Sequence, residues 1–211
     1  MSRRQNTSGA DHHQKPQVDD AERVETLAIP LIVVAGVPGA GKTEALTALP
    51  TQSPRVRLAD PDRIRCQLRR LVPWLPYAYG RPIVHTLAHL WLFAQILNRS
   101  GGPLVVHDPG TRKWSRRIIV ELALLCGYCP MIIYIDTNRA TALKGQTQRG
   151  RVIRSQAFKR HWKRWLELRN RILDSEEISA NEPWCRVVLS HREAVVDDVL
   201  GLLSSGRVAS L

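Results

Sequence analysis

Apolar residues occur in two kinds of segment that alternate along the chain from residue 29 onward. Short segments are apolar at nearly every position and rich in β-branched side chains, as in IPLIVVA over residues 29–35. Such runs are typical of strands buried on both faces of a parallel sheet. Longer segments carry apolar residues at helical spacing, as residues 83–98 do. The pattern therefore predicts strands that alternate with helices.

This alternation predicts five strands and seven helices. We expect strands over residues 29–35, 55–59, 103–107, 131–135 and 185–189. We expect helices over residues 43–49, 61–72, 83–98, 113–126, 138–148, 155–173 and 193–203, and a proline- and aromatic-rich loop over residues 73–82. The order indicates an α/β fold in which a parallel sheet is covered by helices.

The first 27 residues differ from the rest of the chain, because they are polar and nearly free of large apolar side chains. We expect a disordered polar tail over residues 1–27 and one folded domain over residues 28–211. The tail lacks the apolar segment of a secretory signal, which favours a cytoplasmic location. No membrane contact is expected, since the longest apolar stretch, residues 83–97, contains polar residues and is shorter than the roughly 20 residues of a bilayer span.

The strongest chemical signal directly follows the first strand. Residues 36–43 read GVPGAGKT and satisfy the pattern G-x-x-x-x-G-K-[ST]. Glycines let backbone N–H groups converge on phosphate oxygens, Lys42 reaches the β- and γ-phosphates, and the Thr43 hydroxyl can bind Mg²⁺. The sequence therefore predicts a nucleotide site formed by Gly36, Val37, Pro38, Gly39, Ala40, Gly41, Lys42 and Thr43.

Two carboxylates follow the second strand, in the segment ADPDRIR. Ligands bind at the carboxyl ends of parallel strands, where a carboxylate can take the proton of an attacking hydroxyl. An arginine one helical turn later can hold an anionic acceptor or the transferred phosphoryl group. Two frames are open, Asp60 with Arg63 and Asp62 with Arg65. Because Asp60 is also well placed to cap the following helix, Asp62 is the preferred functional residue.

The third strand leads into Asp108. In phosphate-binding folds an acid at this position orients Mg²⁺, usually through water. The Pro-Gly-Thr that follows also suits an Asx turn with Asp108 as the acceptor. We favour the Mg²⁺ site, because this strand is expected beside the one that leads into residues 36–43.

Basic residues are concentrated late in the chain. The formal net charge is +12, and residues 144–171 hold ten basic residues and one acidic residue. Arg149 and Arg151 flank a glycine, which suits a lid over about residues 145–156 that closes over phosphates. The basic and aromatic helix over residues 158–171 could contact a nucleic-acid backbone, although a solvated helix face explains its individual lysines at least as well.

The segments GVPGAGKT, DPDRIR, VVHDPGT, IDTNRATA and QRGRVI together resemble the P-loop kinase-like ATPases grouped with polynucleotide kinase and zeta-toxin-type phosphotransferases. They are especially similar to the AAA_33 type, over about residues 29–173. The resemblance implies a three-layer fold with a five-stranded parallel sheet of order 2-3-1-4-5, helices on both faces and an arginine-rich lid. It also implies a general base at Asp62 or Asp60, an acceptor-side Arg65, a third-strand acid at Asp108 and flap arginines at Arg149 and Arg151.

These features predict an ATP- and Mg²⁺-dependent phosphotransferase that acts on a hydroxyl. Lys42 and the loop amides would hold the nucleotide, Thr43 and Asp108 would place Mg²⁺, and Asp62 would activate the acceptor. Arg65, Arg149 and Arg151 would stabilise the transferring phosphoryl group. The acceptor is a nucleic-acid 5′-hydroxyl or a small metabolite. The alternatives are a non-catalytic nucleotide- or nucleic-acid-binding regulator, and a plain ATPase.

Overall fold

The computed structural model describes residues 29–71, 74, 77–98, 102–148, 154–175 and 177–205. Its strands are β1 (Ile29–Ala35), β2 (Arg57–Ala59), β3 (Leu104–His107), β4 (Tyr128–Asp136) and β5 (Arg186–His191). Its helices are α1 (Lys42–Gln52), α2 (Pro61–Leu71), α3 (Tyr77–Leu97), α4 (Lys113–Leu125), α5 (Arg139–Gln148), α6 (Ser155–Ser175) and α7 (Val195–Ser205). The predicted tail over residues 1–27 lies outside the described residues.

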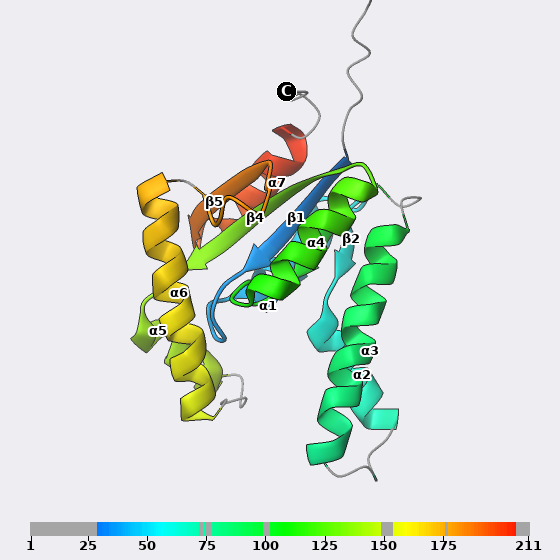
Figure 1. Cartoon of the computed structure of the whole chain (residues 1–211), viewed down its shortest axis with the longest axis vertical. Coiled ribbons are helices and arrows are strands. Elements are labelled where there is room, and N and C mark those ends of the chain that lie inside the picture. Colours follow the sequence, from blue (N-terminus) through cyan, green and yellow to red (C-terminus); the bar gives the residue numbers. More distant parts are fainter. Residues whose placement is uncertain are drawn as a thin grey trace, which may run out of the picture.

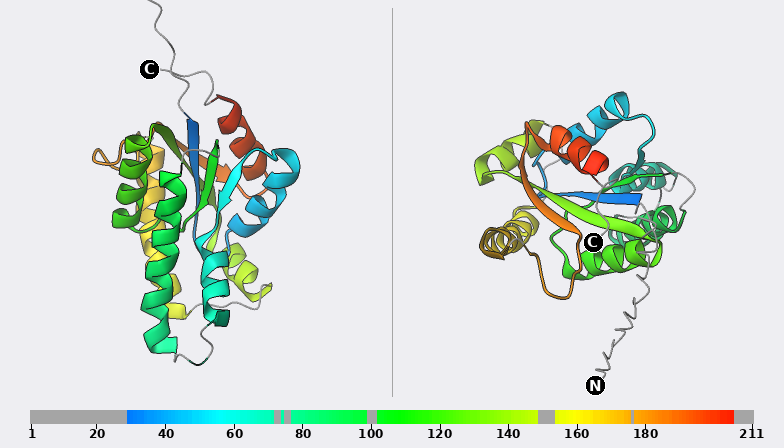
Figure 2. Two further views of the ribbon diagram at one scale, coloured as in Figure 1. Left: turned by 90° about the vertical axis from the view of Figure 1, so that its right-hand side faces the viewer. Right: turned by 90° about the horizontal axis from the view of Figure 1, so that it is seen from above.

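The five strands form one parallel sheet in the order β2-β3-β1-β4-β5, which confirms the predicted fold class. The central strand β1 pairs with β3 on one side and with β4 on the other. Helices α1 and α7 cover one face of the sheet, and α3, α4 and α6 lie on the other (Figures 1 and 2). Because all strands run the same way, their carboxyl ends meet at one edge, the lower one in Figure 1.

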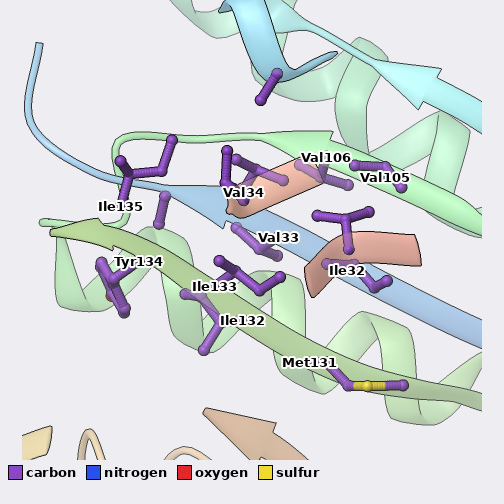
Figure 3. Packing of buried hydrophobic residues seen from close by; sticks show 14 of the residues in the cluster. Ile32, Val33, Val34, Val105, Val106, Met131, Ile132, Ile133, Tyr134 and Ile135 are labelled. Atoms are coloured by element: carbon purple, nitrogen blue, oxygen red, sulfur yellow. The ribbon is translucent and has the colours of Figure 1, made fainter. Parts of the chain in front are cut away.

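The core lies between these two helical layers and is centred on β1 and β4. Figure 3 shows their side chains packed closely together, with those of Val105 and Val106 from β3 beside them. Six of the seven residues of β1 are buried in succession rather than alternately. Continuous burial follows because helices cover both faces of the sheet, so that no face of β1 meets water.

Two helices extend past prolines at which the sequence indicated their limits. Residues 73–82 were expected to form a loop, but α3 begins at Tyr77 and includes Pro82. Pro82 lies in the second turn, so its missing N–H removes a single hydrogen bond close to the helix start. Helix α1 continues through Pro50, because the φ of proline suits a helix, and the N–H of Ser53 donates to Leu49 at 2.8 Å. In the described part of the chain no helix is long and apolar enough to cross a membrane.

Strand β4 begins three residues earlier than expected. The apolar run over residues 131–135 predicted a start directly after Pro130, and proline is generally disfavoured inside central strands. In the structure Tyr128 and Cys129 already pair with β1, and the carbonyl of Pro130 accepts the N–H of Cys185 at 2.8 Å. A proline is tolerated here because its carbonyl still pairs across the sheet.

All four cysteines are free. Cys66 on α2 and Cys185 before β5 are exposed, whereas Cys126 and Cys129 are partly buried. The thiol group of Cys185 is nevertheless partly buried, and this partial burial, together with a hydrogen bond to the neighbouring thiol of Cys129, raises its pKa to about 12. The thiol of Cys185 is therefore protonated at neutral pH.

Candidate active site

Residues 36–43, the phosphate loop, connect β1 to α1 at the carboxyl edge of the sheet. Their backbone conformation depends on glycine. Gly39 has a φ of +93°, and a Cβ on it would lie 2.0 Å from the carbonyl oxygen of Ala142 on α5. Only a residue without a side chain allows this approach. Helix α5 therefore packs directly against the phosphate loop.

Three further contacts hold the phosphate loop from outside. The side-chain amide of Gln146 on α5 donates to the carbonyl of Pro38 at 3.1 Å. The N–H of Gly36 donates to the carbonyl of Pro109, after β3, at 3.2 Å. The side chain of Arg192 lies against Gly41 and forms an ion pair with a glutamate of α1. The loop is thus fixed before any ligand arrives, which is the preorganisation that phosphate binding requires.

Lys42 is the first residue of α1, and its side chain is only 6% exposed. Its Nζ donates to the carbonyl oxygens of Gly36 at 2.6 Å and Val37 at 3.0 Å. The ammonium group is therefore held against the start of the phosphate loop. Thr43 follows it in the first turn of α1 and is exposed. Both residues lie at the positive end of the α1 dipole, where an anion is stabilised.

Asp60 directly follows β2 and caps the start of α2. Helix capping is one of the two roles that the sequence allowed for this residue. Its Oδ1 accepts the N–H of Asp62 at 2.9 Å and Nδ1 of His107 at 2.7 Å. Burial by itself raises the pKa of Asp60, but the hydrogen bond and charge of His107 outweigh it, helped by the backbone N–H groups of Asp62 and Arg63. The pKa of Asp60 consequently lies below its ordinary value. Sequence reasoning did not anticipate the contact with His107.

Asp62 lies in the first turn of α2 and pairs with Arg65 one turn later. The side chain of Asp62 is 37% exposed, against 22% for Asp60. Arg65 also donates through Nη1 to Nδ1 of His85 on α3 at 3.0 Å. Its Nε is buried without a hydrogen-bond partner among the described residues. The structure contains the predicted pair of Asp62 with Arg65. In place of the predicted pair with Arg63, the side chain of Asp60 contacts His107.

Asp108 is 6% exposed and lies beside the end of β1, since its N–H donates to the carbonyl of Val34 at 3.3 Å. Its Oδ1 accepts the N–H of Gly110 at 2.7 Å, and its Oδ2 accepts the hydroxyl of Ser115 at 3.4 Å. The Asx turn that the sequence allowed is therefore present. It fixes the carboxylate next to the phosphate loop, and the role of Asp108 toward Mg²⁺ stays a prediction.

The turn at Gly110 is also held by a buried ion pair that the sequence did not indicate. Arg116 donates to both carboxylate oxygens of Glu182, at 2.7 and 2.8 Å, and their side chains are 4% and 0% exposed. A third nitrogen of Arg116 and the hydroxyl of Tyr134 each donate to the carbonyl of Gly110 at 2.8 Å. Burial alone lowers the pKa of Arg116, but the hydrogen bond to Glu182, the neighbouring hydroxyl of Tyr134 and the charges of Glu182 and Asp108 together raise it. The pair therefore stays charged and holds the Gly110 turn in place.

Thr111, the residue that follows Gly110 in this turn, contacts α6. Oγ1 of Thr111 and Nδ1 of His161 are 2.9 Å apart. Burial lowers the pKa of His161 to about 4, and the charges of Arg112, Lys42, Arg164 and Arg160 add to this effect. His161 is therefore neutral at pH 7 in a strongly positive environment.

The predicted lid arginines Arg149 and Arg151 lie outside the described residues. Of the predicted lid, residues 145–148 end α5 and residues 155–156 begin α6.

A comparison with known protein families identifies the family of this chain. The AAA_33 family, described as an AAA domain, matches residues 31–172. The chain belongs to this family. A search of curated proteins finds no match. The phosphate loop and the carboxylates Asp60, Asp62 and Asp108 lie within the matched residues of this AAA_33 protein, whereas Glu182 and Arg192 lie beyond them.

Solved structures share the fold of the AAA_33 protein. A Chloroflexus aurantiacus protein provisionally described as a kinase has a TM-score of 0.60 and 20% identity, over 85% of this chain and 98% of its own. A gluconokinase from Sinorhizobium meliloti has a TM-score of 0.54 and 14% identity, over 84% and 93%. A shikimate kinase from Acinetobacter baumannii has a TM-score of 0.53 and 16% identity, over 86% and 96%. The fold is therefore that of the P-loop kinases.

Proposed function

We propose that this AAA_33 protein is a Mg²⁺-dependent phosphotransferase that moves the γ-phosphoryl group of ATP to a hydroxyl. The observation that carries the proposal is the position of three carboxylates relative to the phosphate loop. Asp60 and Asp62 follow β2, Asp108 follows β3, and the phosphate loop follows β1, so that all three segments lie at one edge of the sheet.

The sheet order sets the spacing between these groups. Strand β3 separates β2 from β1, and neighbouring strands lie about 4.8 Å apart, so the axes of β2 and β1 are about 10 Å apart. A γ-phosphate above the loop and an acceptor hydroxyl beside Asp62 would share this interval. The geometry supports an in-line transfer between the two strands.

The loop suits the nucleotide, because it combines a backbone that only glycine permits with the buried ammonium of Lys42. Thr43 and Asp108 offer the hard oxygen ligands that Mg²⁺ prefers, and Asp108 is already fixed by its turn. When bound, Mg²⁺ would neutralise phosphate charge. The proposed roles of Lys42 and the loop amides are to bind and orient the β- and γ-phosphates.

Asp62 is the better candidate for the general base. Asp60 uses one oxygen to cap α2 and to hold His107, whereas the carboxylate of Asp62 is more exposed and contacts Arg65. In the proposed step a bond forms between the acceptor oxygen and the γ-phosphorus while the bond from that phosphorus to the β–γ bridging oxygen breaks. The hydroxyl proton passes to Asp62, and ADP leaves. Asp60 positions Asp62 by fixing the start of α2.

The test uses ATP labelled in the γ-phosphate, with the intact chain, Mg²⁺ and a panel of hydroxyl acceptors that includes sugars, small hydroxy acids, nucleosides and 5′-hydroxyl oligonucleotides. We expect label transfer to one class of acceptor. Lys42→Ala should lose nucleotide binding and transfer together, because the ammonium that faces the phosphates is removed. Asp62→Asn should keep nucleotide binding but lower kcat at least a hundredfold, since general-base catalysis contributes about that much.

The alternatives have distinct outcomes in the same assay. Release of labelled phosphate with every acceptor absent, unchanged by Asp62→Asn, would indicate a plain ATPase. Nucleotide binding without transfer or hydrolysis would indicate a non-catalytic regulator. An intact chain that binds no nucleotide would overturn the proposal. Whether the acceptor is a nucleic-acid 5′-hydroxyl or a small metabolite stays a prediction that the panel decides.

A further inference from the structure

A groove lies between α6 and the segment formed by residues 111–117 at the start of α4. Helices α4 and α6 both lie on the face of the sheet opposite α1 and α7 (Figures 1 and 2). Its cavity volume is about 770 Å³. The residues that line it are Thr111, Arg112, Lys113, Trp114, Arg116, Arg117, Arg160, Arg164, Glu167, Leu168 and Arg171. Seven of these side chains are cationic and one is acidic. We call this feature the basic groove.

Most of these cations lack an internal counter-charge. Arg116 is neutralised by Glu182, and Arg117 lies 3.9 Å from Glu121. The other five, Arg112, Lys113, Arg160, Arg164 and Arg171, form no ion pair with a carboxylate in the part of the chain that the structure describes. Five such charges along one groove repel each other, and an anionic ligand would relieve this repulsion.

The charges follow a line rather than a point. Positions 160, 164, 167, 168 and 171 recur at helical spacing and share one face of α6. Position 171 lies 11 residues after position 160, or about 16 Å along the helix axis. A single phosphate would use one end of this line. A strand at the B-form rise of about 3.4 Å per phosphate would place about five phosphates along it, and a more extended single strand would place fewer.

An exposed aromatic ring lies among the cations. Trp114 lines the groove and is 48% exposed, and its ring lies 5.4 Å from the ring of His89 between centroids. A cationic groove with an exposed aromatic side chain is the arrangement that binds single-stranded nucleic acids, because the cations follow the backbone and every base can stack on the ring.

We propose that the basic groove binds a single-stranded segment of nucleic acid, with its phosphates on Arg112, Arg160, Arg164 and Arg171 and a base on Trp114. An acidic peptide would satisfy the cations but would leave the indole without a stacking partner. The proposal goes beyond phosphate transfer, because none of these residues belongs to the phosphate loop. It extends the predicted contact of the helix over residues 158–171 to a second wall, α4.

Helix α6 contains its own control. Lys159 and Lys163 are exposed and precede Arg160 and Arg164 by one residue each, but they do not line the groove. The variant Arg160→Glu/Arg164→Glu and the control variant Lys159→Glu/Lys163→Glu therefore change the net charge equally on the same two turns of helix. Only the first reverses charges inside the groove.

Binding is measured by the fluorescence anisotropy of a labelled 12-nucleotide oligothymidylate at 50 and 200 mM salt. Four phosphate contacts on a single strand predict an affinity that falls about 50-fold over this range. The groove variant should lose at least tenfold in affinity at 50 mM salt, and its salt slope should fall by about 1.4. The control variant should stay within threefold of the unaltered chain. Circular dichroism and thermal melting establish that both variants fold.

Trp114→Leu tests the base contact. It should weaken oligothymidylate binding about tenfold and leave the salt slope unchanged, because stacking contributes without neutralising phosphates. Lys42→Ala should bind the oligonucleotide as tightly as the unaltered chain, so that this proposal and the proposed phosphate transfer can fail separately.

Several outcomes would overturn the proposal. Equal losses in the groove and control variants would show a diffuse charge effect rather than a groove. A polyaspartate peptide that binds as tightly as the oligonucleotide, or a Trp114→Leu variant with unchanged affinity, would show that the groove accepts anions without recognising nucleic acid. Binding that does not respond to salt would exclude backbone contacts.

Discussion

The phosphate loop and the basic groove both attract anions, but they are built differently. The loop is a rigid backbone structure, held by α5, by the turn after β3 and by Arg192, and its one lysine is buried. The groove consists of long side chains from α6 and from residues 111–117, and five of its seven cations form no ion pair with a carboxylate among the described residues. A fixed backbone can recognise the shape of a phosphate, whereas flexible cations recognise only charge along a line. Substitutions near the loop should therefore lower the free energy of unfolding far more than substitutions in the groove.

Arg116 offers the largest test of this difference, because it holds the turn beside the loop and also borders the groove. Arg116→Met leaves the buried carboxylate of Glu182 without its counter-charge, although the indole N–H of Trp184 still lies 3.3 Å from Oε2. The free energy of unfolding should fall by about 3–5 kcal/mol, as measured by urea denaturation. Adding Glu182→Leu should recover most of the loss, because no buried charge then remains.

The neighbouring Arg117 is the control for this variant. It lies on the same helix, is 46% exposed and faces Glu121 at 3.9 Å. Arg117→Met should change the free energy of unfolding by no more than about 0.5 kcal/mol. Equal losses for Arg116→Met and Arg117→Met would mean that the buried pair does not support the loop.

Gly39→Ala tests whether the loop depends on its backbone. The φ of +93° and the 2.0 Å approach to Ala142 leave no space for a methyl group. We expect a loss of about 2 kcal/mol or more in the free energy of unfolding, and at least tenfold weaker ATP binding by calorimetry. Gly201→Ala, on α7 with no atom within 4 Å of the added methyl group, should instead stabilise by up to about 1 kcal/mol. A tolerated Gly39→Ala would contradict the rigid loop.

The two carboxylates after β2 should separate stability from activity. Asp60→Asn replaces a charged acceptor by a neutral one and should cost about 1–2 kcal/mol at pH 7. Because the pKa of Asp60 is lowered on folding, its stabilisation is present above pH 3.8 and is lost as pH falls through the folded-state value. The difference between Asp60→Asn and the unaltered chain should therefore shrink in urea unfolding below pH 3.8.

Asp62→Asn should show the opposite behaviour, with little change in stability, because its pair with Arg65 is partly exposed. Its effect should appear in kcat. If Asp60→Asn lowers kcat as strongly while leaving stability unchanged, the roles of the two residues are exchanged.

We expect the smallest effect from a single substitution in the basic groove. Glu167 is its one acidic lining residue, and Glu167→Gln removes a repulsive charge from an exposed position. Oligothymidylate affinity should rise two- to threefold at 50 mM salt, an effect of about 0.5 kcal/mol. Glu177→Gln, exposed and outside the groove, is the control and should have no effect. Equal gains in both variants would assign the effect to total charge.

Local patterns were sufficient to predict most of the fold. Continuous apolar runs such as residues 29–35 and 131–135 indicated buried parallel strands, and the order of elements indicated the α/β class. The sheet order itself followed from the family resemblance, because local patterns do not show which strands pair. The errors occurred at three prolines. The φ of Pro50 suits a helix, Pro82 lies close to a helix start where few hydrogen bonds are lost, and the carbonyl of Pro130 still pairs across the sheet.

The phosphate loop could be predicted because its residues are contiguous and their spacing is set by the chemistry. The partners of its neighbours could not. Arg116 and Glu182 are 66 residues apart, and nothing in either local sequence indicates burial. His107 and Asp60 meet only because β2 and β3 are adjacent. Likewise, the charge count pointed to residues 144–171 but missed the second wall of the groove, which comes from residues 111–117.

The exposed thiol of Cys66 has a practical consequence for α2. It lies one turn beyond Asp62, whereas Cys126 and Cys129 are partly buried and the pKa of Cys185 is about 12. Since alkylation requires the thiolate, a maleimide dye should attach first at Cys66. The native chain can therefore carry a fluorescent reporter next to the proposed base, and the arrival of an acceptor could be followed in real time without engineering a cysteine.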